Sequence, residues 1–256
     1  GLVFTPTVAE QTSGCRDLAV LVKGTNGGAA IKTPRSSIQY LTYRSKYHFS
    51  RLLIAGAEKP ASGTGQAFET VTGWTVGISQ GDAWNVEIYE VDGYSTYRAD
   101  TDPAGQLKSV FIRLDAENGM LTAHVGSFTC SNWYRGVEIG ERCFFQIQRF
   151  DIAHAHDGVY QTATALPFNE SKLLDGNINA QRYGVMFKKL GARQIGGVIV
   201  RRHRKGWKGA TQDWHGFYLE SCEGVWLTDS HAQPDETEGA FSGTQNAVTL
   251  KSCGAV

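Results

Sequence analysis

The densest group of side chains that could bind a ligand lies between residues 200 and 215. This stretch leaves an apolar run, gathers basic residues, two tryptophans, an aspartate and two histidines, and returns to an apolar run at Gly216. Guanidinium groups pair bidentately with carboxylates, and indole rings stack on pyranose rings, so we predict a site for an acidic sugar. The alternative is a solvated loop whose tryptophans pack on their own strands. The predicted binding residues are Arg201, Arg202, His203, Trp207, Asp213, Trp214 and His215.

A second group of residues could carry acid–base chemistry on a glycosidic bond. Aligning the apolar runs places His154, Arg202 and His231 at comparable points of successive repeats. The same alignment places Asp151 near Thr228. Side chains stacked on parallel strands lie about 4.8 Å apart, so such residues could line one groove. The predicted catalytic residues are Asp151, His154, Glu220 and Asp229.

Glycoside hydrolysis needs two carboxyl groups, about 5–5.5 Å apart for retention or about 6.5–9.5 Å apart for inversion. Glu138 and Glu220 fall at near-equivalent positions two or three repeats apart. Neighbouring or next-neighbour repeats offer both spacings, and the sequence leaves open which carboxylates face each other.

The sequence contains no nucleophile elbow, phosphate loop, dinucleotide fingerprint or zinc-protease motif. Its five cysteines are odd in number and widely spaced, which fits neither a disulfide framework nor a metal site. We therefore expect no cofactor and no metal, and folding in a reducing compartment.

The chain carries 25 basic and 25 acidic residues, so its formal net charge is zero. This balance argues against nucleic acid as a partner, and no apolar run of about 18 residues predicts a membrane span. The chain begins with Gly1, from which we expect a processed protein or a piece of a longer one.

The elements that must position these residues repeat one pattern. Residues 183–190, 215–222 and 246–253 each read as a small or exposed start, alternating apolar residues and a corner, and residues 135–143 fit with one extra residue. Self-similarity at this period is typical of a solenoid, and the alternation has the period of a strand. The fold class predicted is all-β, a right-handed single-stranded parallel β-helix.

Two regions are predicted. Residues 1–67 form an atypical N-terminal β segment or entry coils, and residues 68–256 form coils whose loops lengthen toward the C-terminus. The chain stops at Val256, before the second strand of its last repeat. Because an open parallel stack exposes unpaired backbone groups, we expect either a fragment or a covering chain.

The repeats resemble those of the pectate-lyase-like β-helix superfamily, and most closely those of bacteriophage tailspikes, over roughly residues 70–256. The resemblance implies a homotrimer on the virion, folded in the bacterial cytoplasm, that binds and depolymerises a bacterial capsule or O-antigen polysaccharide. It transfers no catalytic residue, because that family has no universal catalytic motif. The segments that carry the resemblance are Gly136–Cys143, Asp157–Val159, Tyr183–Phe187, His215–Cys222 and Val248–Cys253.

Two other functions stay open. The chain could be a non-enzymatic structural or adhesive module of a tail fibre, with the β-helix as a rigid spacer. It could also be a cellular polyuronate lyase or epimerase, which would need a signal peptide and a dense cluster of Asp, Arg and Lys around one repeat.

Overall fold

The computed structural model describes residues 1–4, 12–22, 28–33, 46–56, 74–95, 108–116, 121–161, 171–189, 191, 193–202, 213–234 and 243–254. Within these ranges every element is a β-strand, and all strand pairs are parallel. No helix of the described part has the length and apolarity needed to cross a bilayer. The all-β prediction and the parallel pairing are therefore confirmed.

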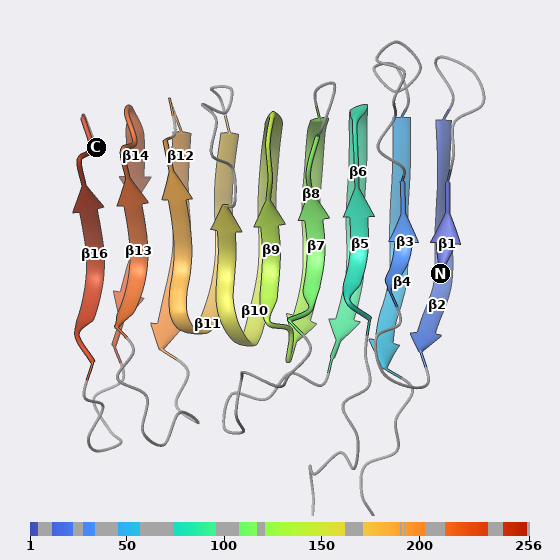
Figure 1. Cartoon of the computed structure of the whole chain (residues 1–256), viewed down its shortest axis with the longest axis horizontal. Helices are drawn as coiled ribbons and strands as arrows, with labels where there is room; N and C mark the ends of the chain where they lie inside the picture. The colour runs from blue at the N-terminus through green and yellow to red at the C-terminus, as the bar shows by residue number, and fades with distance from the viewer. Residues whose placement is uncertain are drawn as a thin grey trace, which may run out of the picture.

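The strands form two parallel ladders that the chain visits alternately (Figure 1). Ladder A contains β1 (Leu2–Val3), β3 (Ala29–Lys32), β5 (Val76–Gln80), β7 (Val110–Leu114), β9 (Arg135–Ile139), the second halves of β10 (Cys143–Gln161) and β11 (Ser171–Lys188), β13 (Trp214–Glu220) and β16 (Gln245–Lys251). Ladder B contains β2 (Thr12–Val22), β4 (Lys46–Gly56), β6 (Ala83–Tyr94), β8 (Leu121–Ser131), the first halves of β10 and β11, β12 (Arg193–Arg202), β14 (Val225–Thr228) and β15 (His231–Gln233). One visit to each ladder makes one rung.

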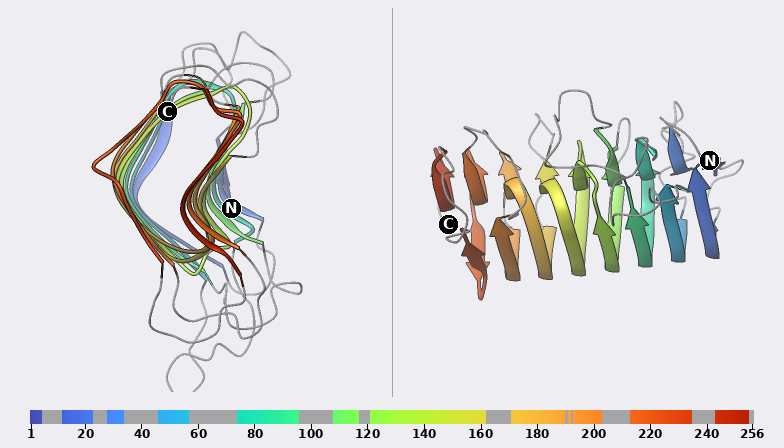
Figure 2. Two further views of the ribbon diagram at one scale, coloured as in Figure 1. Left: turned by 90° about the vertical axis from the view of Figure 1, so that its left-hand side faces the viewer. Right: turned by 90° about the horizontal axis from the view of Figure 1, so that it is seen from below.

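The two ladders are the walls of one curled sheet. β10 and β11 each run from ladder B into ladder A without interruption, so they join the walls covalently and by hydrogen bonds. The end-on view shows the walls facing each other, with the wall of ladder A bowed toward ladder B (Figure 2). The described parts of residues 1–67 contribute β1 to β4 to the same two ladders.

The core lies between the walls and is built from columns of apolar side chains, one per rung. Parallel strands place equivalent residues about 4.8 Å apart, so like side chains stack and exclude water along the whole axis. One column of ladder A contains Ile31, Ile78, Ile112, Val137, Val159, Val185 and Phe217. A column of ladder B contains Phe49, Ile88, Val125, Ile147, Leu173 and Ile195.

A column of glycines lets ladder A approach ladder B. A Cβ added at Gly184 would lie 2.2 Å from Val200 Cγ1 and 2.5 Å from the Gly216 carbonyl oxygen. The same crowding occurs at Gly158, where Ile178 Cγ2 would be 2.4 Å away. The ladder B side chains thus fill the space that a ladder A side chain would take. The glycine column consists of Gly136, Gly158, Gly184 and Gly216.

The corner that the sequence repeats predict is present on three rungs. Cys143, Cys222 and Cys253 each follow a residue with positive φ, which turns the chain out of ladder A. Each thiol donates to the carbonyl two residues earlier and to a carbonyl of the neighbouring rung; for Cys222 these are Glu220 and Phe187. All five cysteines are free. The predicted register is confirmed too, because Tyr183 pairs with His215 and His215 with Asn246.

A second column of left-handed residues bends ladder B on every rung. These residues are skipped in the strand pairing and have φ between 48° and 64°. A left-handed residue with a side chain costs about 1–2 kcal/mol, yet only one of the eight is glycine. The bend column consists of Asp17, Arg51, Glu90, Ser127, Arg149, Asp175, Gly197 and Asp229.

Candidate functional site

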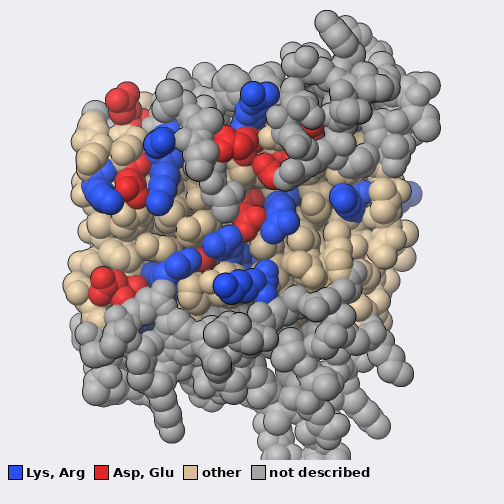
Figure 3. Space-filling model, viewed as in Figure 1, with Lys and Arg blue, Asp and Glu red and all other residues tan. Residues whose placement is uncertain are grey.

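The outer surface of ladder A gathers aromatic and charged side chains over successive rungs. Its strands present one outward column at their start and another in their middle, on the side away from the glycine column. Figure 3 looks onto this wall and shows basic and acidic groups interleaved across it. We call this set the ladder A face: Arg113, Tyr134, Arg135, Glu138, Asp157, Tyr160, Arg182, Tyr183, Lys188, His215, Tyr218, Glu220 and Lys251.

Asp157 lies at the centre of this face and is fully buried. Arg182 donates to both carboxylate oxygens, from Nε at 2.8 Å and from Nη2 at 2.6 Å. Arg135 Nε donates at 3.3 Å, and His156 Nδ1 lies 3.1 Å away. Burial alone would raise the pKa of Asp157, but the contacts with His156 and Arg182 outweigh it and lower the pKa to about 2. Asp157 is therefore a permanent anion at neutral pH.

The charges continue from Asp157 as an alternating chain across four strands. Arg135 Nη1 donates to Glu138 Oε2 at 2.5 Å, and Arg113 Nε donates to Glu138 Oε1 at 2.7 Å. Each carboxylate of the chain is thus held by two guanidinium groups. We call this the arginine chain; its order is Arg113, Glu138, Arg135, Asp157 and Arg182.

A shorter alternating chain lies at the ends of the ladder A strands. Glu220 accepts from Lys251 Nζ at 2.9 Å and from Lys188 Nζ at 3.2 Å. The hydrogen bond from Lys251 is the main reason that the pKa of Glu220 is lowered. Tyr218 also donates its hydroxyl to Glu220, at 3.2 Å. We call Lys188, Glu220 and Lys251 the lysine chain.

Aromatic rings and guanidinium groups stack along the axis between the rungs. The Arg135 guanidinium lies 4.0 Å from the Tyr160 ring centroid, and that of Arg182 lies 4.7 Å from the Tyr183 centroid. Tyr183 stacks on His215 at 5.3 Å with an interplanar angle of 23°. The ring faces are therefore used largely within the stack, so the surface offers mainly ring edges, hydroxyls and N–H groups.

The ring of Tyr218 is oriented differently from the stacked rings of Tyr183 and His215. Its ring is inclined by 58° to Tyr183 and by 78° to His215. Burial and then the charge of Glu220 raise the pKa of Tyr218, while burial is also the main cause that raises the pKa of Tyr183. These hydroxyls stay protonated at neutral pH. The hydroxyl of Tyr218 already donates to Glu220, so it can only accept from a ligand. Burial lowers the pKa of His215, which favours the neutral imidazole.

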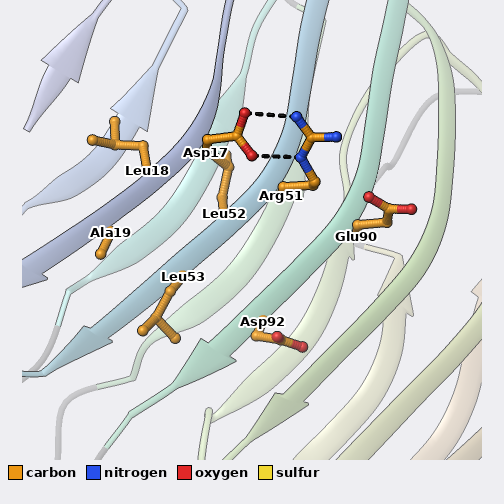
Figure 4. A pocket seen from close by; sticks show the side chains of 8 residues that line it. All are labelled: Asp17, Leu18, Ala19, Arg51, Leu52, Leu53, Glu90 and Asp92. Carbon is orange, nitrogen blue, oxygen red and sulfur yellow. Dashed lines mark hydrogen bonds and ion pairs between the residues drawn. The ribbon is translucent and has the colours of Figure 1, made fainter.

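A separate open depression of about 440 Å³ lies on ladder B, at the bend column. Arg51 donates from Nε at 2.5 Å and from Nη2 at 2.6 Å to the two oxygens of Asp17, so both charges are paired with each other (Figure 4). Two exposed leucines, Leu18 and Leu53, also line it. This pair joins two rungs at their strained residues, which is a structural role. The lining is Asp17, Leu18, Ala19, Arg51, Leu52, Leu53, Glu90 and Asp92.

The structure separates the predicted binding residues. Trp214 is fully buried and its Nε1 donates to the Ala180 carbonyl oxygen at 3.2 Å, so the prediction that it stacks on a sugar is wrong. Arg202 is also buried, whereas Arg201 and Asp213 are exposed. Asp213 accepts from the Thr244 amide at 2.8 Å. Only His215 belongs to the ladder A face; His203 and Trp207 lie outside the described residues.

The predicted catalytic residues do not converge either. Glu220 belongs to ladder A, whereas Asp151 and Asp229 are exposed on ladder B. The rungs of Asp151 and Asp229 are three steps apart, roughly 14 Å along the axis. His154 is exposed at a left-handed corner that follows the paired residue Ala153.

The predicted alignment of the second strands also needs correction. His231 pairs with Ile199, which aligns through Asn177 with Asp151 and not with His154. The left-handed residue at His154 is unpaired and shifts the register by one. Thr228 aligns with Gln148, three residues before Asp151.

The first-strand acids are also offset from each other. Glu138 shares its column with Tyr160, Met186 and Tyr218, so Glu220 lies two residues beyond the equivalent position.

Sequence reasoning missed the centre of the face, Asp157, because Asp-Gly is also turn chemistry. The signal was present in the repeats, since residues 157–159 align with residues 135–137 and 183–185. Within the described ranges, no three His, Cys, Asp or Glu side chains are placed so that they could hold a metal ion. No family model, no curated protein and no solved structure matches the chain.

Proposed function

We propose that the chain is a right-handed parallel β-helix of the tailspike type, and that its ladder A face binds a bacterial surface polysaccharide such as a capsule or O-antigen. The observation that carries the proposal is the row of tyrosines, histidine and arginines that continues over successive rungs of one wall. A surface that repeats about every 4.8 Å suits a ligand made of repeating units. Hydroxyl and guanidinium donors are the groups that sugar hydroxyls and carboxylates accept from.

Other features support the remaining parts of this proposal. Each rung adds one segment to ladder A and one to ladder B, which is the connectivity expected of a single-stranded β-helix. The free cysteines, two of them buried at corners, suit assembly in a bacterial cytoplasm and delivery on a phage particle. A homotrimer is the assembly that we propose.

The chemistry of this face favours binding over hydrolysis. A glycosidase needs a carboxylic acid that can donate a proton near neutral pH. Asp157 has a pKa of about 2, and the hydrogen bond from Lys251 lowers the pKa of Glu220, so neither carboxylate suits that role. The non-enzymatic adhesive function therefore has a specific observation in its favour.

The test is to incubate the chain with a panel of capsular and O-antigen polysaccharides, measuring both retention of the protein and polymer length. We expect at least one polymer to be retained with its length unchanged. Shortening would support the depolymerase function, and Asp151→Asn, Glu220→Gln and Asp229→Asn would then show whether the predicted carboxylates act. Retention of no polymer on the panel would contradict the proposal. Light scattering of the same sample gives the solution mass and tests the trimer.

A further inference from the structure

The arginine chain and the lysine chain indicate which class of polysaccharide the ladder A face binds. We infer that the ligand is anionic, with carboxylate groups that pair with Arg182 on one side of the aromatic row and with Lys188 and Lys251 on the other. This inference rests on the proposed function and names its ligand class.

The two runs of ion pairs on the ladder A face carry an excess of positive charge, although the whole polypeptide has no net charge. Both chains begin and end with a cation, so five basic side chains hold only three carboxylates and leave two positive charges in excess. The complete sequence has equal numbers of basic and acidic residues. An alternating chain that served the fold alone could end with either sign. Cations at all four ends create a local field that attracts anions.

The terminal cations keep donors that the protein does not use. Arg182 binds Asp157 through Nε and Nη2, and within the described part of the chain its Nη1 donates to no other group. Stacking on Tyr183 and the bidentate pair hold this guanidinium in place, so its third nitrogen is preorganised. The Lys251 and Lys188 side chains are 60% and 42% exposed, and each ammonium has three donors, of which Glu220 accepts one.

The spacing of these cations fits a chain of sugars better than a small ion. Arg182 precedes and Lys188 ends the segment of β11 in ladder A, which separates them by roughly 20 Å of extended chain. Tyr183 and Tyr218 lie between the two cationic edges. Acidic groups on successive sugars can therefore meet separate cations, while the neutral parts of the sugar rings contact the exposed edges of the tyrosine rings.

The test compares carboxylated polymers with neutral polymers of the same backbone. The probes are polysialic acid and hyaluronan, each against its carboxyl-reduced form, with affinities measured by isothermal titration at low and high salt. The variant Lys188→Gln/Lys251→Gln removes both cations from the lysine chain and leaves the arginine chain and the core untouched. Lys172→Gln is the matched control, since it is an exposed lysine of the same strand, β11, in ladder B.

We expect binding to a carboxylated polymer that weakens with salt, falls roughly fivefold per lysine in the double variant and is unchanged in Lys172→Gln. Equal binding of the reduced and carboxylated forms, or an unaffected double variant, would overturn the inference and leave polysaccharide binding itself intact. Retention of neutral surface polysaccharides but of no acidic one would also overturn the inference and leave polysaccharide binding intact. If neither acidic nor neutral polymers are retained, the proposed function fails and the inference fails with it.

Discussion

Arg182 and Asp157 form a bidentate ion pair between two adjacent strands, with Nε–O and Nη2–O distances of 2.8 and 2.6 Å and the carboxylate fully buried. The same guanidinium lies over the ring of Tyr183. One arginine therefore ties neighbouring rungs together and orients an aromatic side chain of the candidate site. A substitution in the Arg182–Asp157 pair should therefore change both the stability of the stacked rungs and the geometry of the ladder A face.

Asp157→Asn should lower the free energy of unfolding by about 3–5 kcal/mol, because it leaves two arginines without their buried anion. Urea denaturation measures the change. Asp151→Asn is the control, since Asp151 is an exposed carboxylate on the same strand, and it should stay within about 0.5 kcal/mol of the wild type. Equal effects of the two substitutions would contradict a structural role of the arginine chain.

The stability of the protein should fall in acid through Asp157. Its pKa is about 2 in the folded chain, against about 3.9 when unfolded. A carboxylate with a lowered pKa stabilises the fold above its unfolded pKa, and this contribution of about 2–3 kcal/mol is lost as the pH falls from about 4 to about 2. Denaturation measured between pH 5 and pH 2 should show this loss in the wild type but not in Asp157→Asn. Parallel pH profiles for both proteins would show that Asp157 does not carry the effect.

Gly184→Ala should destabilise the stack by about 1–3 kcal/mol, as overpacking does in a filled core. The new methyl group would meet Val200 and the Gly216 carbonyl oxygen. Gly254→Ala is the comparison, because its Cβ would come no closer than 3.4 Å to Glu223. Thermal unfolding distinguishes them, and a Gly184→Ala protein as stable as the wild type would mean that the walls are not in close contact here.

Arg149 tests the bend of ladder B, since it is exposed and has a φ of 52°. Arg149→Asn should be neutral or slightly stabilising, because asparagine tolerates the left-handed region. Arg149→Val should cost about 1–2 kcal/mol, because a β-branched side chain does not tolerate it. Gln148→Val, one residue earlier in extended backbone, controls for the change in polarity. A melting temperature that is higher for Arg149→Val than for Arg149→Asn would exclude this account of the bend.

The rungs could be predicted because their information is local and repeated. Residues 183–188, 215–220 and 246–251 pair as the alignment of the repeats predicts, and Cys143, Cys222 and Cys253 occupy equivalent corners. The bend column could not be found in the same way. Aspartate, arginine, glutamate, serine and glycine all occur in it, so the strain leaves no constant residue type.

The site was harder to predict because it depends on which residues share a column. The segment 200–215 looked richest in chemistry, but burial of Trp214 turns one of its aromatic residues into core. His154 looked equivalent to His231, but the strand pairing aligns His231 with Asp151, three residues earlier. The ladder A face arises from six separate strands, and no short stretch of sequence contains more than a part of it.

The central claim is that polysaccharide binds to the outer surface of ladder A. The most direct measurement is the affinity for a retained polysaccharide of Tyr218→Ala and of Tyr94→Ala, an exposed tyrosine of ladder B. The account predicts that Tyr218→Ala weakens binding about tenfold and that Tyr94→Ala binds like the wild type, with both proteins folded by circular dichroism. Loss of binding in Tyr94→Ala with full binding in Tyr218→Ala would place the ligand on the other wall and contradict the account.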